Sequence, residues 1–218
     1  MAESEYRTVG NDCRTEQTIN RSRFIASASH VCSENDALAF INKIRREFPD
    51  ATHNCYAYVL GHGQIARHSD DGEPSGTAGL PILEAIQGRA LTQTAVVVTR
   101  YFGGTLLGTG GLVRAYSRTA GKCLDMAGVS LYRRHAIYSF VVDYSVYSRL
   151  SRLDGIMVTK MDFAEKVAVE IGLDCEHERA IFDKIADVCA GTAEYERIGE
   201  SYLKIDFSYG GMNDDNNH

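Results

Sequence analysis

The sequence has no tryptophan, three prolines and no run of about 18 apolar residues. Without such a run no helix could span a bilayer, so we expect no membrane contact. The first residues, Met1-Ala2-Glu3-Ser4-Glu5, are acidic and lack the apolar segment of a secretory signal. The 44% of hydrophobic and 24% of charged residues are ordinary for a globular protein. From the lack of a membrane span and of a secretory signal we expect a protein of the cytoplasm.

Cysteine patterns that bind metals are also absent. The six cysteines form no Cys-x-x-Cys pair, and their spacings match no zinc module. In a reducing compartment, such residues are mostly small buried apolar side chains. We therefore predict neither a metal nor a cofactor. The cysteines are Cys13, Cys32, Cys55, Cys123, Cys175 and Cys189.

The net charge of −6 is distributed unevenly along the chain. Residues 1–135 carry 15 Lys and Arg against 13 Asp and Glu, a balance of +2, whereas residues 136–218 carry 8 against 16, a balance of −8. This asymmetry favours two domains, 1–135 and 136–210, followed by a disordered Asn/Asp-rich tail at 211–218. It argues against the second domain as a binder of polyanions, although two ordinary solvated surfaces would give the same counts.

The first 135 residues predict a mixture of strands and helices. Residues 1–15 are polar, and we expect them to be frayed. Ser33 is a suitable N-cap for a helix that ends at Phe48-Pro49-Asp50. The other expected elements are strands at 18–31, 55–60 and 64–68, a turn at 61–63, a loop at 69–79, a helix at 78–87, a central strand at 92–100, and a helix ending near 127.

The second half predicts shorter alternating units after a basic link at 133–135. We expect strands at 136–143, 157–163, 165–173 and 195–207, and helices at 146–153 and 178–190. The resulting order, β-α-β-β-α-β, is typical of a ferredoxin-like domain. The predicted fold class is therefore α+β with two domains.

The segment from Val96 to Arg114 carries the clearest functional signal. A β-branched run enters it and a helical pattern leaves it, an arrangement that exposes backbone N–H groups to an anion. It lacks the Gly-Lys-Ser/Thr of a phosphate loop and the spacing of a dinucleotide fingerprint. An anion nest with Arg100 and Arg114 as charge partners remains open, as does simple turn geometry and close packing. The loop glycines are Gly103, Gly104, Gly108, Gly110 and Gly111.

Three separated motifs resemble the YigZ/IMPACT family. They are His53-Asn54-Cys55-Tyr56-Ala57, the loop from Asp70 to Gly79, and Arg100-Tyr101-Phe102-Gly103-Gly104 through Gly108. The resemblance covers roughly residues 18–128, and the second half is similar to the small C-terminal domain of bacterial YigZ-type members. It implies a first domain with the βαβ fold of a ribosomal small-subunit protein and a second similar to the last domain of elongation factor G. It also implies a link to translation, because eukaryotic relatives regulate translation initiation through protein partners.

The Arg100-Tyr101-Phe102 triplet offers an arginine for phosphate and an aromatic face for a base. Adjacent strand residues point to opposite faces, so at most one of Tyr101 and Phe102 shares the environment of Arg100. The alternative is packing, with one aromatic ring in the core and the other at its rim.

Asp70, Asp71 and Glu73 place three carboxylates in one short loop. With His53 and His68 near in sequence they suggest a divalent-metal site, but no spaced ligand motif supports it. We favour a structural role, in which the carboxylates stabilise a helix start or pair with an arginine such as Arg100 or Arg67.

His53 and Cys55 lie two residues apart on a strand and would face the same side, as a base and a thiol nucleophile require. No strained nucleophile turn accompanies them, so a buried structural cysteine is favoured over a catalytic pair.

These interpretations lead to one expected function and two alternatives. We expect a non-enzymatic regulatory protein linked to translation, which presents Arg100, Tyr101, the glycine loop and Arg114 to RNA or to a ribosome-associated protein. One alternative is a small hydrolase built on His53, Cys55 and the Asp70–Glu73 loop. The other is a sensor whose glycine nest binds an anionic small molecule such as a phosphorylated metabolite.

Overall fold

The computed structural model describes residues 4–190 and 193–205. The chain divides into two compact units, Tyr6–Leu131 and Met1–Glu5 with Tyr132–His218. The tail predicted at 211–218 and the end of the strand predicted at 195–207 lie outside the described residues. In the part of the chain that is described, no helix is long and apolar enough to cross a membrane.

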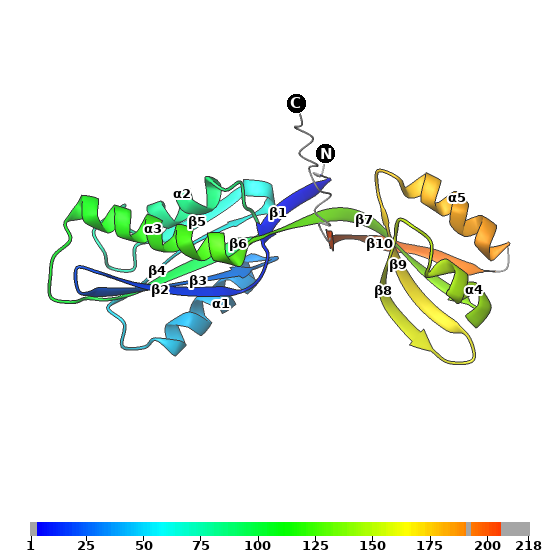
Figure 1. Cartoon of the computed structure of the whole chain (residues 1–218), viewed down its shortest axis with the longest axis horizontal. Helices are drawn as coiled ribbons and strands as arrows, with labels where there is room; N and C mark the ends of the chain where they lie inside the picture. Colours follow the sequence, from blue (N-terminus) through cyan, green and yellow to red (C-terminus); the bar gives the residue numbers. More distant parts are fainter. Residues whose placement is uncertain (1–3, 191–192, 206–218) are drawn as a thin grey trace, which may run out of the picture. The chain divides into compact units, whose positions relative to one another are not determined.

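The first unit is built on a five-stranded antiparallel sheet (Figure 1). Its strands lie in the order β2-β3-β6-β4-β5, so β6 is central, as its continuous apolar run predicts. A 3₁₀ turn, η1, connects β4 to β5. The bounds are β2 Cys13–Ile19, β3 Ser22–His30, β4 His53–Leu60, η1 Gly61–Gly63, β5 Ile65–Ser69 and β6 Thr94–Tyr101.

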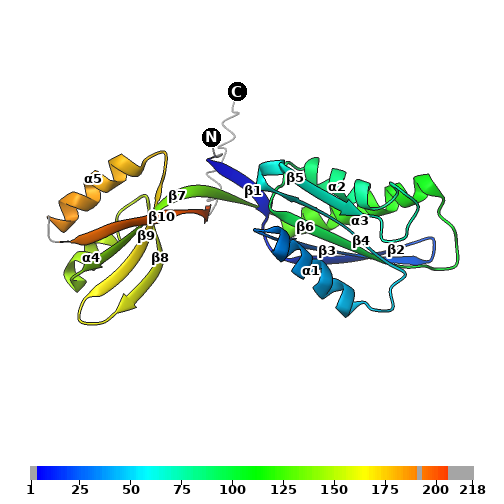
Figure 2. The same cartoon turned by 180° about the vertical axis from the view of Figure 1, so that it is seen from behind.

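Helices cover both faces of this sheet (Figures 1 and 2). α1 (Glu34–Glu47) packs on one face, and α2 (Gly79–Gln87) and α3 (Thr109–Ala127) pack on the other. The side chain of Ser33 accepts a hydrogen bond from the Asp36 N–H, which confirms the predicted N-cap of α1. Because both faces are covered, β6 is buried along nearly its whole length although its neighbours are antiparallel.

The N-terminal segment differs from the prediction. Residues 1–15 were expected to be frayed, but β1 (Glu5–Val9) and the start of β2 lie there. A single strand was expected over 18–31, whereas the chain turns back at Asn20 and Arg21, which both have positive φ. That backbone is typical of a two-residue hairpin turn, and the Asn-Arg pair lacks the glycine by which such turns are usually recognised.

The second unit has the predicted order β-α-β-β-α-β. Strands β10, β7, β9 and β8 are neighbours in that order, β1 also pairs with β7, and the helices pack against a core that includes Phe140, Leu150 and Ile171. The basic link predicted at 133–135 is wrong, because these residues lie inside β7. The bounds are β7 Val129–Val142, α4 Tyr144–Leu150, β8 Ile156–Phe163, β9 Val167–Asp174, α5 Glu178–Cys189 and β10 Glu194–Ile205.

Candidate functional site

The sheet register places three side chains beside one another at the end of β6. Arg100 lies directly opposite His53 of β4 on one side and Phe24 of β3 on the other. Directly paired residues on adjacent strands point to the same face, here the face covered by α2 and α3. The Arg100 guanidinium lies 5.3 Å from the centre of the Phe24 ring. Two of the three motifs in the sequence therefore meet through strand pairing.

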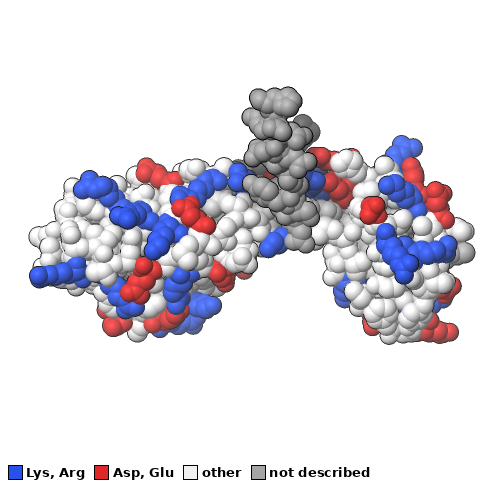
Figure 3. Space-filling model, in the orientation of Figure 1, with Lys and Arg blue, Asp and Glu red and all other residues white. Residues whose placement is uncertain are grey.

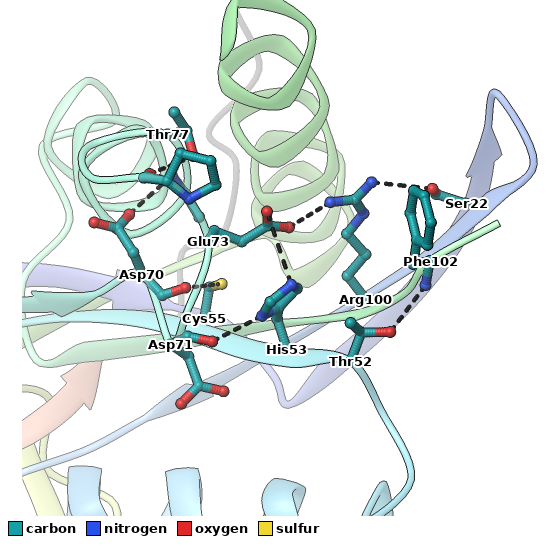
Figure 4. Close-up of polar contacts among 12 residues, drawn as sticks. Ser22, Thr52, His53, Cys55, Asp70, Asp71, Glu73, Thr77, Arg100 and Phe102 are labelled. Carbon is teal, nitrogen blue, oxygen red and sulfur yellow. Dashed lines mark hydrogen bonds and ion pairs between the residues drawn. The ribbon is translucent and has the colours of Figure 1, made fainter. Parts of the chain in front are cut away.

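Arg100 is the centre of a buried polar network (Figure 4). Its Nη1 donates to Glu73 Oε1 at 2.6 Å and its Nη2 donates to Ser22 Oγ at 3.2 Å. The Tyr116 hydroxyl of α3 also donates to Glu73 Oε1, at 2.7 Å, and His53 Nε2 lies 3.9 Å from Glu73 Oε2. Both charged side chains are about 5% exposed or less. The expectation that Arg100 is presented to RNA phosphate is thus wrong, because its charge is already matched inside the protein.

The three loop carboxylates point to different partners, so they do not form the metal site considered above. Asp70 accepts hydrogen bonds from the N–H groups of Gly76, Ala78 and Gly79 at the start of α2. Burial opposes ionisation of Asp70, but these donors outweigh it and hold its pKa below the usual value. No cluster of potential metal ligands occurs among the described residues.

Asp71 contacts β4 and α1 instead of the start of α2. Its carboxylate accepts from the backbone N–H of Asn54 at 2.7 Å and from Arg45 of α1 at 3.0 Å. Its carbonyl oxygen lies 2.8 Å from His53 Nδ1. The loop carboxylates thus have structural roles, as favoured from the sequence, and Glu73 is the one that pairs with Arg100.

Cys55 is buried behind this loop and does not act with His53. Its thiol donates to the Asp70 carbonyl oxygen at 2.9 Å and lies 3.4 Å from the Tyr116 hydroxyl. Burial raises the pKa of Cys55 well above its usual value. A protonated, buried thiol is a poor nucleophile, so the arrangement gives no support to the hydrolase alternative.

The two aromatic residues after Arg100 separate as strand geometry requires. The Tyr101 hydroxyl donates to Asp50 at 2.9 Å on the α1 side. The Phe102 ring centre lies 5.5 Å from the Arg100 guanidinium, and the side chain is 46% exposed. Phe102 is therefore the aromatic that shares the environment of Arg100, with much of its ring open to a ligand.

The loop glycines have different reasons for being glycine. A Cβ at Gly103 would overlap the backbone carbonyl of Arg21, so Gly103 is required by close packing. Gly104 and Gly108 have positive φ, which glycine adopts without strain. Gly110 and Gly111 lie in the first turn of α3. A Cβ at Gly111 would lie 3.1 Å from the Leu107 Cβ, which is a tight contact, whereas a Cβ at Gly110 would meet only the end of the Arg114 side chain at 3.5 Å. Within the described residues, no side chain caps this helix start, and the first turn has no acidic residue.

A pocket of about 430 Å³ lies between the buried network and the start of α3. We call it the His53 pocket. His53, Glu73 and Arg100 are among its polar lining residues, and Phe102 and Leu106 are among the apolar ones. Cys55, Asp70 and Asp71 do not line it. The remaining lining residues are Thr52, Pro74, Leu107, Gly108, Thr109 and Leu112.

Arg114, which was predicted as a site residue, is the first of three basic residues in a row on α3. The other two were not predicted. Arg114, Arg118 and Lys122 follow one another at intervals of four along α3, and all three are exposed. None has an ion-pair partner among the described residues. We call these residues the α3 stripe, and basic side chains gather over α3 in Figure 3. The spacing Arg-x₃-Arg-x₃-Lys in the sequence was the available signal.

Hollows continue from the His53 pocket along α3. One of about 640 Å³ shares Leu107 with that pocket and is lined by Arg114 and Arg118. The next, of about 560 Å³, shares Ser117 and Arg118 with it and is lined by Lys122. Three hollows that share lining residues therefore follow α3, and the last of them is lined by the carboxylate of Asp125 as well as by the cations of the stripe. We call the last two hollows the basic groove.

The comparisons with known proteins match either the first unit or most of the chain. The Impact N-terminal domain matches residues 20–124. The IMPACT family member YvyE of Bacillus subtilis is 36% identical over 91% of this chain and 94% of its own length. The IMPACT family member YigZ of Escherichia coli is 34% identical over 84% of this chain and 93% of its own. A crystal structure described as that of a hypothetical protein is similar with a TM-score of 0.63 and 31% identity, covering 90% of this chain and 98% of that one.

Proposed function

The chain belongs to the IMPACT family, and on that premise we propose that it acts in translation by binding RNA phosphates along the α3 stripe. The observation that carries this proposal is the row of three exposed cations with no ion-pair partner among the described residues. Asp125, the carboxylate that lines the hollow beside Arg118 and Lys122, pairs instead with Arg89, whereas the charge of Arg100 is matched by Glu73.

The spacing of the stripe suits a polyanion. Four residues of α-helix rise about 6 Å, so the three cationic heads are arranged as a row along the helix axis. Contacts to phosphate position a nucleic acid without reading its sequence, and lysine and arginine make most of them. The basic groove beneath the stripe provides room for a single strand.

A role in translation is the family context of this proposal. Its relatives include eukaryotic regulators of translation initiation, as the resemblance described from the sequence implies. RNA of the translation machinery is therefore the partner we propose, and a ribosome-associated protein is the alternative that the binding experiment tests.

Binding of single-stranded RNA, measured by fluorescence anisotropy across a salt series, tests this function. Three phosphate contacts predict that log K falls with log salt with a slope of about −2. Arg118→Glu should weaken binding at least tenfold and make the slope shallower. Arg46→Glu, on the exposed side of α1 across the sheet, is the matched control and should leave binding unchanged. Equal effects of the two reversals, or affinity that does not depend on salt, would contradict the proposal.

A further inference from the structure

Two hydrogen-bond acceptors in the lining of the His53 pocket receive no donor from the described residues. We infer that the pocket binds one nucleobase that carries an exocyclic amino group, as cytosine does, and that this base belongs to the RNA strand whose phosphates lie on the α3 stripe. The inference rests on the proposed function, since it names the kind of base that the same strand places beside the basic groove.

Glu73 supplies the first acceptor. Its Oε1 accepts from Arg100 Nη1 at 2.6 Å and from the Tyr116 hydroxyl at 2.7 Å. Its Oε2 accepts no hydrogen bond from the described residues, although the side chain is only 4% exposed and lines the pocket. Oε2 is not enclosed, as Arg100 Nε is, and stays accessible from the pocket. Because buried polar atoms in native proteins are nearly always hydrogen-bonded, Oε2 indicates a donor that comes from the pocket.

His53 supplies the second acceptor (Figure 4). Its Nδ1 lies 2.8 Å from the carbonyl oxygen of Asp71, and a carbonyl only accepts, so Nδ1 carries the proton. In the neutral imidazole, Nε2 is then an acceptor, and it lies 3.9 Å from Glu73 Oε2. That distance is too long for a hydrogen bond between the two atoms. An amino group placed beside them has two N–H groups to donate, one to each acceptor.

The charge of the pocket favours a neutral donor over a cation. Arg100 and Glu73 form an ion pair with 2.6 Å between Nη1 and Oε1, so the lining has no net charge when His53 is neutral. An ammonium or guanidinium group would add a second positive charge beside Arg100, and like charges at short distance repel. An amino group on an aromatic ring donates the same hydrogen bonds without that cost.

The rest of the lining suits a flat ring. The Phe102 side chain is 46% exposed, and an exposed aromatic ring stacks with any nucleobase. Pro74, Leu106 and Leu107 add apolar surface, and Leu106 is 87% exposed. The volume of about 430 Å³ lies within the range of roughly 300–1,000 Å³ that is typical of small-ligand sites. Among pyrimidines, cytosine meets both requirements, whereas uracil has a carbonyl in place of the amino group.

The position of the pocket connects this base to the RNA strand. The pocket shares Leu107 with the first hollow of the basic groove, which is lined by Arg114 and Arg118. Contacts to phosphate position a strand, and contacts to base edges select its sequence. A strand that follows the α3 stripe therefore has a base beside the pocket, where His53 and Glu73 select it.

Fluorescence anisotropy with 8-nucleotide oligo(C) and oligo(U) tests the inference, because the two RNAs have the same backbone and differ at this amino group. We expect oligo(C) to bind about tenfold more tightly at equal salt. Phe102→Ala should weaken the binding of oligo(C) about tenfold. Tyr101→Ala, which removes the aromatic ring on the α1 side of the sheet, is the matched control and should leave binding unchanged.

His53→Asn tests the acceptor itself. Asparagine keeps an N–H donor near the position of Nδ1 and removes Nε2, so the preference for oligo(C) should disappear while oligo(U) still binds. An unchanged melting temperature shows that the variant is folded. Free cytidine and uridine, added to the parent protein and followed by thermal shift, make the same comparison without a variant, and only cytidine should stabilise the protein.

The outcomes separate this inference from the proposed function. Oligo(C) and oligo(U) that bind equally well, with binding lost in Arg118→Glu, would overturn the inference and leave the proposed function standing. Cytidine that binds in preference to uridine, while neither RNA binds, would support the base site and overturn both its assignment to an RNA strand and the proposed function. A preference for oligo(C) that survives His53→Asn would show that His53 and Glu73 do not select the base.

Discussion

Arg100 and Arg118 belong to the same unit, yet one is a structural residue and the other a surface cation. Arg100 is about 5% exposed and is held by Glu73 and Ser22, with an aromatic ring near its guanidinium. Arg118 is exposed on α3, with no ion-pair partner among the described residues. The position of an arginine beside glycines in a motif therefore does not show that its charge is available to a ligand. Availability depends on whether the fold supplies a carboxylate.

The largest expected effect comes from removing the partner of Arg100. Glu73→Gln leaves a buried guanidinium without a counter-charge, which destabilises proteins by about 3–5 kcal/mol. For the first unit this predicts a melting temperature lower by about 6–20 °C. Thermal and urea unfolding measure it, and Arg118→Glu should change stability by less than about 0.5 kcal/mol.

A double variant sharpens this first prediction. Arg100→Met with Glu73→Gln removes both charges and keeps an acceptor for the Tyr116 hydroxyl, so it should recover part of the lost stability. If Glu73→Gln is as stable as the parent protein, the network is not the structural centre that its geometry indicates.

The same contrast explains what could be predicted from the sequence. The favoured pairing of a loop carboxylate with an arginine such as Arg100 is found at Glu73, and β6 was recognisable as central from its apolar run. The burial of Arg100 could not be predicted, because it depends on the register that brings Glu73, 27 residues away, into contact. The three loop carboxylates carry the same charge, so the sequence does not distinguish them as partners of Arg100. The backbone conformation of the loop decides which one faces Arg100.

The surface residues present the opposite case. Arg118 and Lys122 follow Arg114 at helical spacing, so the α3 stripe was available in the sequence without any knowledge of the fold. The hairpin at Asn20 and Arg21 was not, since its positive φ values occur without glycine and nothing local marks the turn.

A smaller effect should follow from Asp70, which shares the loop with Glu73 but is engaged by N–H groups. Asp70→Asn keeps the side-chain size and removes the charge, and we expect a loss of about 1 kcal/mol at pH 7, as for other helix-start carboxylates. The folded-state pKa is lowered, so the contribution of the charge is complete above the unfolded value of about 3.9 and is lost as the pH falls below it.

Urea unfolding from pH 7 to pH 3 measures this dependence. The difference between the parent protein and Asp70→Asn should shrink below about pH 4, because protonated Asp70 resembles asparagine. Glu84→Gln, an exposed site on α2, is the control and should show little difference at either pH. A difference that stays constant with pH would mean that the charge of Asp70 does not contribute.

The smallest change in stability is expected for a substitution at Gly110. This position tests whether a glycine of the loop is needed for folding or for ligand binding. Gly110 lies in the first turn of α3, and an added Cβ would meet only the end of the Arg114 side chain, at an ordinary 3.5 Å. Gly110→Ala should therefore stabilise the first unit by about 0.5–1 kcal/mol, measured by urea unfolding. Its N–H group stays in place, but a methyl group at this position hinders the close approach of a phosphate. If stability rises while the affinity for RNA falls, Gly110 is glycine for the ligand, whereas Gly103 is glycine for the fold. If both properties are unchanged or improve, no phosphate of the RNA approaches the start of α3.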